Sequence, residues 1–217
     1  MPVRPVREAS LLDSLPVSPF GASACGGRPD AAFMNGGVLF ARWLMANVVG
    51  FVVGSLLGAS NDGLIVATLP RLPGLILGDL VFGAAIGASQ WLALRDSRSR
   101  SVPPQWILAT SVGFAVGARS GTRLAAGLLA VVPVPLSTAF GIFVGASVGL
   151  ATAWVLRDRL RPVLAFAWVA LNALAWVLGE GIAFSHGFSQ WSMGLVSLAI
   201  ASVTWLGFEL LHVRPHP

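Results

Sequence analysis

Long apolar runs alternate with short polar segments along most of this chain. Six runs contain about the 20 apolar residues that a helix needs to cross the hydrocarbon core of a membrane. Prolines, arginines and aspartates in the intervening segments end the runs. The pattern therefore predicts an all-α transmembrane fold with six spanning helices, which cover residues 38–59, 74–94, 105–121, 136–156, 163–184 and 193–213.

The segments outside these runs are predicted to lie outside the membrane. Residues 1–36 are rich in proline, glycine, alanine and serine, so we expect a disordered N-terminal tail before a transmembrane domain of residues 37–213. Met34 is an alternative to Met1 as the translation start. Residues 214–217 form a C-terminal tail. Residues 124–132 are too few to cross a membrane, and we expect a separate short helix at its surface.

Part of the chain is repeated. Residues 83–117 align with residues 145–179 without a gap, at a distance of 62 positions. Trp106 and Trp168 are equivalent in this alignment, and Trp43 stands 63 positions before Trp106 in a further partial copy. The repeat predicts a six-helix bundle made of three two-helix units of about 62 residues, in which the second helix of the third unit has diverged.

Small residues recur at every fourth position in five of the six runs. This spacing keeps them on one face of each helix, where they allow the backbone of another helix to approach closely. Such runs predict tight helix packing, either within one chain or between copies. The glycines concerned are Gly50, Gly54, Gly58, Gly83, Gly87, Gly113, Gly117, Gly121, Gly141, Gly145, Gly149 and Gly179.

The composition agrees with a membrane protein and assigns it an orientation. Of all residues 55% are hydrophobic and 11% are charged, and the mean hydropathy is +0.78. The 14 basic residues are all arginine, and most of them lie in short loops and tails, which does not favour a nucleic-acid partner. Eleven of them lie on the side of the two termini. The positive-inside rule therefore predicts a multi-pass protein of the cell (inner) membrane with cytoplasmic N- and C-termini.

Three charged residues fall inside the predicted spans at one depth, near the outer ends of their helices: Asp79, Arg119 and Glu180. Intramembrane charges are costly, so they pair with one another or line a pathway. An Asp79–Arg119 pair, a Glu180–Arg119 pair, exposure to outer water, and a substrate or proton site all remain open.

Three equivalent polar residues follow the repeated tryptophans by one helical turn: Asn47, Thr110 and Asn172. We expect them to form hydrogen bonds between helices that fix the register of the packing. The alternative is that they line a central path as pseudo-symmetric ligands.

Three common motifs of catalytic or nucleotide-binding sites are absent from the sequence. The chain has one cysteine and contains no HExxH, P-loop or dinucleotide motif. We therefore expect no catalytic residue, no metal and no cofactor, and we do not expect an enzyme.

The segment Gly83-x-x-x-Gly87-x-x-Gln90-Trp91-Leu-x-Leu-Arg95, which continues to Trp106 and Gly113-x-x-x-Gly117, resembles a group of bacterial multi-pass membrane proteins with GxxxGxxQWLxLR-type repeats. The resemblance covers residues 43 to about 180. The second copy has Thr152 and Ala153 in place of Gln-Trp. The group has no established activity, so the resemblance supports the repeat architecture and implies no functional residue.

The many packing motifs and the scarcity of reactive groups favour a scaffold or accessory subunit of a membrane complex. Its partners would be the lipid bilayer and either further copies of the chain or a larger membrane complex. The alternative is a small-solute or ion transporter, because three two-helix units of the same orientation can surround a pseudo-threefold path.

Overall fold

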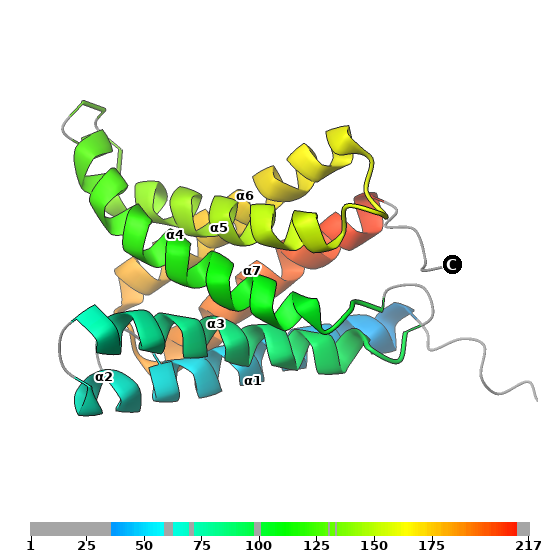
Figure 1. Cartoon of the computed structure of the whole chain (residues 1–217), viewed down its shortest axis with the longest axis horizontal. Helices are drawn as coiled ribbons and strands as arrows, with labels where there is room; N and C mark the ends of the chain where they lie inside the picture. Colours follow the sequence, from blue (N-terminus) through cyan, green and yellow to red (C-terminus); the bar gives the residue numbers. More distant parts are fainter. Residues whose placement is uncertain are drawn as a thin grey trace, which may run out of the picture. The chain divides into compact units, whose positions relative to one another are not determined.

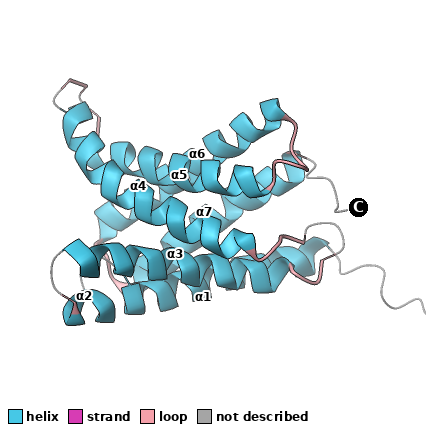
Figure 2. Ribbon diagram, viewed as in Figure 1, coloured by secondary structure: helices cyan, strands magenta, loops and turns pink. Residues whose placement is uncertain are grey.

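The computed structural model describes residues 36–58, 63–69, 72–97, 101–129, 131–132 and 134–211. Apart from Gly36, the predicted N-terminal tail lies outside these residues, as do Met34 and residues 212–217. All regular secondary structure in the described ranges is helical (Figure 2). The prediction of an all-α fold is therefore confirmed.

The described residues form six long helices of 20–25 residues and one short helix (Figure 1). The apolar runs of the sequence form the long helices, and the proline-containing or charged segments form the connections between them. The elements are α1 (Gly36–Gly58), α2 (Leu64–Thr68), α3 (Leu72–Leu94), α4 (Gln105–Leu129), α5 (Leu136–Val155), α6 (Pro162–His186) and α7 (Gln190–Leu210).

Helix α4 is longer than its sequence predicts. It continues without a break to Leu129, so the expected separate helix of residues 124–132 is wrong. The first prolines after the start of α4 are Pro133 and Pro135, and nothing before them prevents the backbone from staying helical. The hydroxyl of Thr122 also donates to the carbonyl of Ala118 in the same helix, at 2.8 Å. The hydroxyl of Thr122, just before this stretch, is thus accommodated within the helix.

Five of the six long helices have the length and hydropathy to cross a membrane. The exception is α4, which carries Arg119 and Arg123. Large apolar side chains on the outside of the helices support the same class: Leu108 is 65% exposed and Leu150 is 61% exposed, while Asn47 is fully buried. An apolar exterior around a polar interior is the arrangement that lipid, rather than water, stabilises. The chain is therefore a membrane protein.

The six long helices form a closed ring. In chain order α1, α3, α4, α5, α6 and α7 each pack against the next, and α7 packs against α1. Among the described residues, the backbones of long helices on opposite sides of the ring do not come into contact, and only side chains meet across it. Helices α1, α4 and α6 run in one direction and α3, α5 and α7 run in the other (Figure 1). Side chains from all six helices must therefore fill the middle.

Helices α3, α5 and α7 all end at the same end of the ring. We call it the RD end, because Arg95-Asp96 and Arg157-Asp158 lie there. Two polar contacts join separate segments at this end. The guanidinium of Arg42 lies 3.9 Å from the carboxylate of Asp96, and Arg159 donates a hydrogen bond to the carbonyl of Ser101. These contacts connect the start of α1 and both RD segments. The opposite end of the ring is called the cavity end.

The glycine faces lie between neighbouring helices of the ring. A Cβ placed at Gly117 would lie 2.7 Å from the Cα of Val144, and one at Gly83 would lie 2.7 Å from the Cα of Ser111. At each of the twelve glycines the site of a Cβ has an atom of another helix within 3.1 Å, a side-chain atom at Gly121 and Gly179 and a backbone atom at the rest. The chain thus uses its own glycine faces for packing between its own helices.

This packing can be tested with Gly145→Ala. The added Cβ would lie 2.5 Å from the carbonyl oxygen of Asn172 and 2.6 Å from the Cα of Ala173, so α5 and α6 must move apart. Overpacking of this kind costs about 1–3 kcal/mol. We expect the apparent melting temperature of the detergent-purified protein to fall by several degrees.

Gly181→Ala is the matched control on α6, because a Cβ there meets no atom within 4 Å. Alanine is about 1 kcal/mol better than glycine inside a helix. The control should therefore melt at the wild-type temperature or slightly above it. A Gly145→Ala protein as stable as this control would contradict the packing described here.

Candidate functional site

One residue in four on α1, α4 and α6 points into the ring, and together these residues form layers along its middle. Equivalent residues of the repeat occupy each layer. From the RD end to the cavity end they are Trp43, Asn47, Phe51 and Ser55 on α1, Trp106, Thr110, Phe114 and Ala118 on α4, and Trp168, Asn172, Trp176 and Glu180 on α6. All of them except the partly buried Phe114 are buried.

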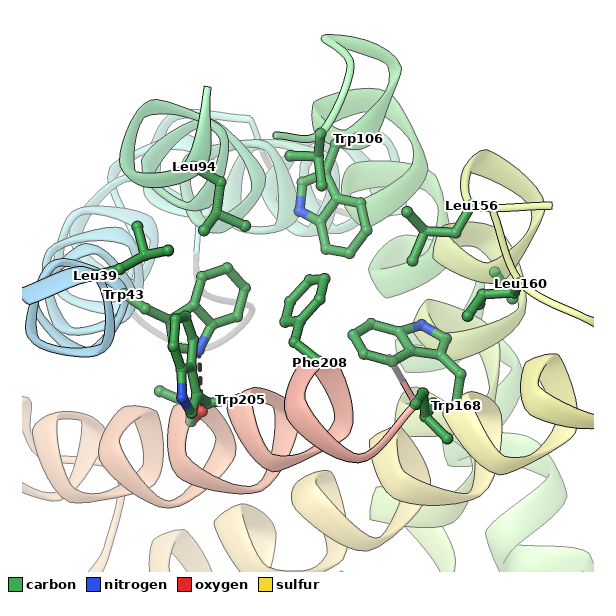
Figure 3. Packing of buried hydrophobic residues seen from close by; sticks show 13 residues of the cluster. Leu39, Trp43, Leu94, Trp106, Leu156, Leu160, Trp168, Trp205 and Phe208 are labelled. Carbon is green, nitrogen blue, oxygen red and sulfur yellow. Dashed lines mark hydrogen bonds between the residues drawn. The ribbon is translucent and has the colours of Figure 1, made fainter. Parts of the chain in front are cut away.

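The three repeated tryptophans close the RD end around Phe208 of α7, and we call these four residues the tryptophan layer (Figure 3). The ring centroid of Phe208 lies 5.4 Å from that of Trp43, 6.1 Å from that of Trp106 and 4.9 Å from that of Trp168. Leu94 and Leu156 pack into the same cluster and are fully buried. The middle of the ring is therefore filled here.

The tryptophan layer differs from what the sequence suggests. Tryptophans near helix ends commonly lie at the membrane surface, but Trp43, Trp106 and Trp168 are only 1–2% exposed and face inward. Trp154 does point outward: it is 62% exposed, and the guanidinium of Arg157 lies 4.6 Å from its ring centroid. Indoles are buried here because a ring of six helices leaves a wide middle that small side chains do not fill.

Hydrogen bonds connect the buried indoles to neighbouring helices. The Nε1 of Trp106 donates to the Oε1 of Gln90 at 2.8 Å, and the Nε2 of Gln90 donates to the Oδ1 of Asn47 at 2.8 Å. In the next unit the Nε1 of Trp168 donates to the Oγ1 of Thr152 at 2.9 Å. Gln90 and Thr152 are equivalent in the repeat. The same link between units therefore occurs twice with different acceptors.

Of the three polar residues expected to join helices, one does so. Asn47 bonds to Gln90 of α3. The hydroxyl of Thr110 donates to the carbonyl of Trp106, and the amide of Asn172 donates to the carbonyl of Trp168, both within their own helix at 2.9 Å. The cavity beside Thr110 and Asn172 has a volume of about 20 Å³. This is room for about one water molecule, which is too little for a small solute.

Four aromatic rings cross the middle of the ring in the next layer, which we call the aromatic floor: Phe51, Phe82, Phe114 and Trp176. Each ring contacts the next, with centroid distances of 5.5 Å from Phe51 to Phe82, 4.5 Å from Phe82 to Phe114, 5.4 Å from Phe114 to Trp176 and 5.7 Å from Trp176 back to Phe51. These separations are typical of favourable aromatic pairs. The floor separates the closed half of the ring from the open half.

Beyond the floor lies a cavity of about 530 Å³. All six long helices contribute to its wall, which is largely aromatic and aliphatic. Its polar side chains are Ser55, Thr122, Ser189 and Glu180. Among the described residues that line the cavity, Glu180 alone is ionisable. The cavity exists because small side chains such as Ala118 and Ala183 stand here in place of the tryptophans of the other end.

The structure brings together two of the three charged residues and separates the third. The Nε of Arg119 lies 2.5 Å from the Oδ2 of Asp79, although the two groups are not aligned for a hydrogen bond. Asp79 is 1% exposed and Arg119 is 30% exposed along its side chain. Glu180 is 7% exposed, and its Oε2 has no hydrogen-bond partner among the described residues. Glu180 lies in the cavity wall and Asp79 does not.

Comparisons of the chain with protein families, with curated proteins and with solved structures give no match. The resemblance to proteins with GxxxGxxQWLxLR-type repeats therefore stays a prediction. Within the described part of the chain, no three histidine, cysteine, aspartate or glutamate residues gather in a way that could hold a metal ion.

Two parts of the site were not recognised from the sequence. Nothing in the sequence indicates that Gln90 links the amide of Asn47 to the indole of Trp106. The equivalence of Glu180 with Ser55 and Ala118 was also missed. The repeat contains it, because positions 55, 118 and 180 continue the spacing of four that starts at the tryptophans.

The Asp79–Arg119 ion pair can be tested with a double-mutant cycle of Asp79→Asn and Arg119→Gln. Removing one partner of a buried pair costs about 3–5 kcal/mol, and the exposure of Arg119 lowers our expectation to about 1–3 kcal/mol for each single variant. The double variant should lose less than the sum of the two. Apparent melting temperatures of the purified proteins measure the coupling.

Arg123→Gln serves as the control, because Arg123 is exposed one turn further along α4. It should not couple with Asp79→Asn. Coupling of Arg119→Gln with Glu180→Gln, together with additivity of Arg119→Gln and Asp79→Asn, would contradict the observed pairing and favour the Glu180–Arg119 alternative.

Proposed function

We propose that this protein is a small-solute transporter with six membrane spans, whose solute binds in the cavity beyond the aromatic floor. The observation that carries the proposal is the cavity itself. Its volume of about 530 Å³ lies within the range of about 300–1,000 Å³ that is typical of small-molecule sites, and all six long helices contribute to its wall. A site between repeated units is also where transporters bind their substrates.

The proposal includes α4 as the sixth span. Helix α4 has 25 residues and packs between α3 and α5 in the ring. Its inward residues and its small residues recur at the same spacing of four as in α1 and α6. Arg119 contributes to its lower hydropathy, and this arginine pairs with Asp79 of α3. Pairing lowers the cost of a charge within a membrane. The six long helices then form three two-helix units, which are α1 with α3, α4 with α5, and α6 with α7.

The arginines support an orientation for the transporter. The RD end contains Arg42, Arg95, Arg157, Arg159 and Arg161, so we infer that this end and both termini face the cytoplasm of a bacterial cell. The cavity then opens on the outer side of the membrane. The tryptophan layer closes the inner side.

We favour transport over the scaffold role that the glycine runs suggest. Those runs support a scaffold only if they are free to bind other chains, and in this ring they contact the neighbouring helices of the same chain. The lining of the cavity has a single ionisable group among the described residues, which supports binding rather than catalysis. A scaffold role remains a prediction that co-purification from the native membrane would test.

Single cysteines test this proposal in a Cys25→Ser background. Ala118→Cys places a thiol in the cavity wall, whereas Val116→Cys places one on the lipid-facing side of the same helix, where Val116 is 54% exposed. A charged methanethiosulfonate reagent added outside intact cells should label Ala118→Cys and not Val116→Cys. Labelling of Ala118→Cys from the cytoplasmic side alone would contradict the orientation, and labelling from neither side would contradict an open cavity.

Thr110→Cys distinguishes a transporter from a static scaffold. Thr110 lies between the tryptophan layer and the aromatic floor, so its thiol is inaccessible in the state described here. A transporter must also open towards the other side. In inverted membrane vesicles a fraction of Thr110→Cys should therefore react from the cytoplasmic side. No reaction after prolonged exposure, in a protein whose Ala118→Cys variant does react, would contradict transport.

A further inference from the structure

Glu180 occupies a position where the other two units of the repeat have small residues. Its equivalents are Ser55 and Ala118, and all three side chains line the cavity. Because serine and alanine suffice there in α1 and α4, helix packing does not require a carboxyl group at this position. Glu180 is nevertheless more than nine-tenths buried. Its presence therefore needs an explanation other than packing.

No cation of the described chain offsets the charge of Glu180. Arg119, which the sequence offered as a partner, is paired with Asp79. Among the described residues, no arginine or histidine lines the cavity, and Glu180 takes part in no ion pair. Its Oε2 also lacks a hydrogen-bond donor there. A buried carboxylate is costly without a partner, and a bound cation would supply one.

The rest of the wall suits the remainder of such a ligand. Phe51, Phe114 and Trp176 form the base of the cavity, and Phe140, Phe184 and Phe188 are further along its sides. The faces of aromatic rings attract cations and bury alkyl or aryl groups. The volume of about 530 Å³ is much larger than an inorganic ion needs. The chemistry of the wall is thus that of a site for an organic cation.

We propose that the cavity binds a small organic cation with alkyl or aryl groups, and that its ammonium or similar cationic group pairs with Glu180. The inference rests on the proposed function, because it needs a cavity that solutes reach, and it names the class of solute. It requires no partner protein and no covalent step.

The test uses Ala118→Cys in the Cys25→Ser background, with Glu180 either retained or changed to glutamine. The cationic trimethylammonium-ethyl methanethiosulfonate and the anionic sulfonatoethyl reagent carry opposite charges on similar frames. The quantity compared is the labelling rate with the cationic reagent divided by the rate with the anionic reagent, normalised to the same ratio for a free thiol. With Glu180 present this normalised ratio should be at least about tenfold, because charges interact strongly in surroundings that are largely apolar. With Glu180→Gln the normalised ratio should fall to about one.

Protection by a ligand completes the test. Phenyltrimethylammonium should slow the labelling of Ala118→Cys when Glu180 is present and not when it is glutamine. Its uncharged isostere, tert-butylbenzene, should protect both proteins equally. Glu180→Asp should keep a preference for the cation, and an unchanged melting temperature of Glu180→Gln would show that the fold is intact.

The outcomes separate this inference from the proposed function. If Ala118→Cys reacts but shows no charge preference, or if both isosteres protect equally when Glu180 is present, the organic-cation inference is wrong while the open cavity stands. If Ala118→Cys does not react at all, the proposed function itself fails. If Glu180→Gln alone does not fold, the Glu180→Asp protein takes its place in the test. A normalised rate ratio near one in Glu180→Asp, or no protection of Glu180→Asp by phenyltrimethylammonium, then overturns the inference.

Discussion

Close approach between helix backbones is the constraint on which the rest of this structure depends. In lipid, apolar surface gives little drive for helices to associate, so contact energy comes largely from tight packing. The glycine faces supply it at successive interfaces, as at Gly117 against Val144 and Gly145 against Ala173. The backbone of each long helix thereby lies against one long helix on each side and against none across the middle. A ring of six helices follows, and its middle is wider than backbones alone can close.

The size of the inward side chains then decides where the ring is closed. At the RD end Trp43, Trp106 and Trp168 meet around Phe208 and fill the middle. The buried indole of Trp106 also requires an acceptor, which Gln90 provides. Twelve residues further along the same inward face, α1 and α4 carry only Ser55 and Ala118. One repeated pattern therefore gives a sealed half and a hollow half, separated by the aromatic floor.

Sequence periodicity predicted much of this fold because residues four positions apart share a helix face whatever that face contacts. It located the long helices and the glycine faces, and it offered the Asp79–Arg119 pair as one of four alternatives. Periodicity does not state which neighbour a face meets. For that reason the inward direction of the tryptophans, the role of Gln90 and the cavity were not predicted. Hydropathy also weighs each residue alone, and it takes no account of the ion pair between Arg119 of α4 and Asp79 of α3.

Departures from the repeat mark the positions where packing alone does not explain the residue. Equivalent positions face equivalent surroundings, so packing alone favours similar residues at each of them, as the three tryptophans illustrate. Polar variation at such positions has another cause. In the layer of Asn47, Thr110 and Asn172, each polar side chain forms a hydrogen bond with a group of the same chain. In the layer of Ser55, Ala118 and Glu180 the difference is not resolved within the described chain, because the Oε2 of the carboxyl group has no partner there. A buried ionisable group that its own protein does not satisfy is best explained by a ligand that does.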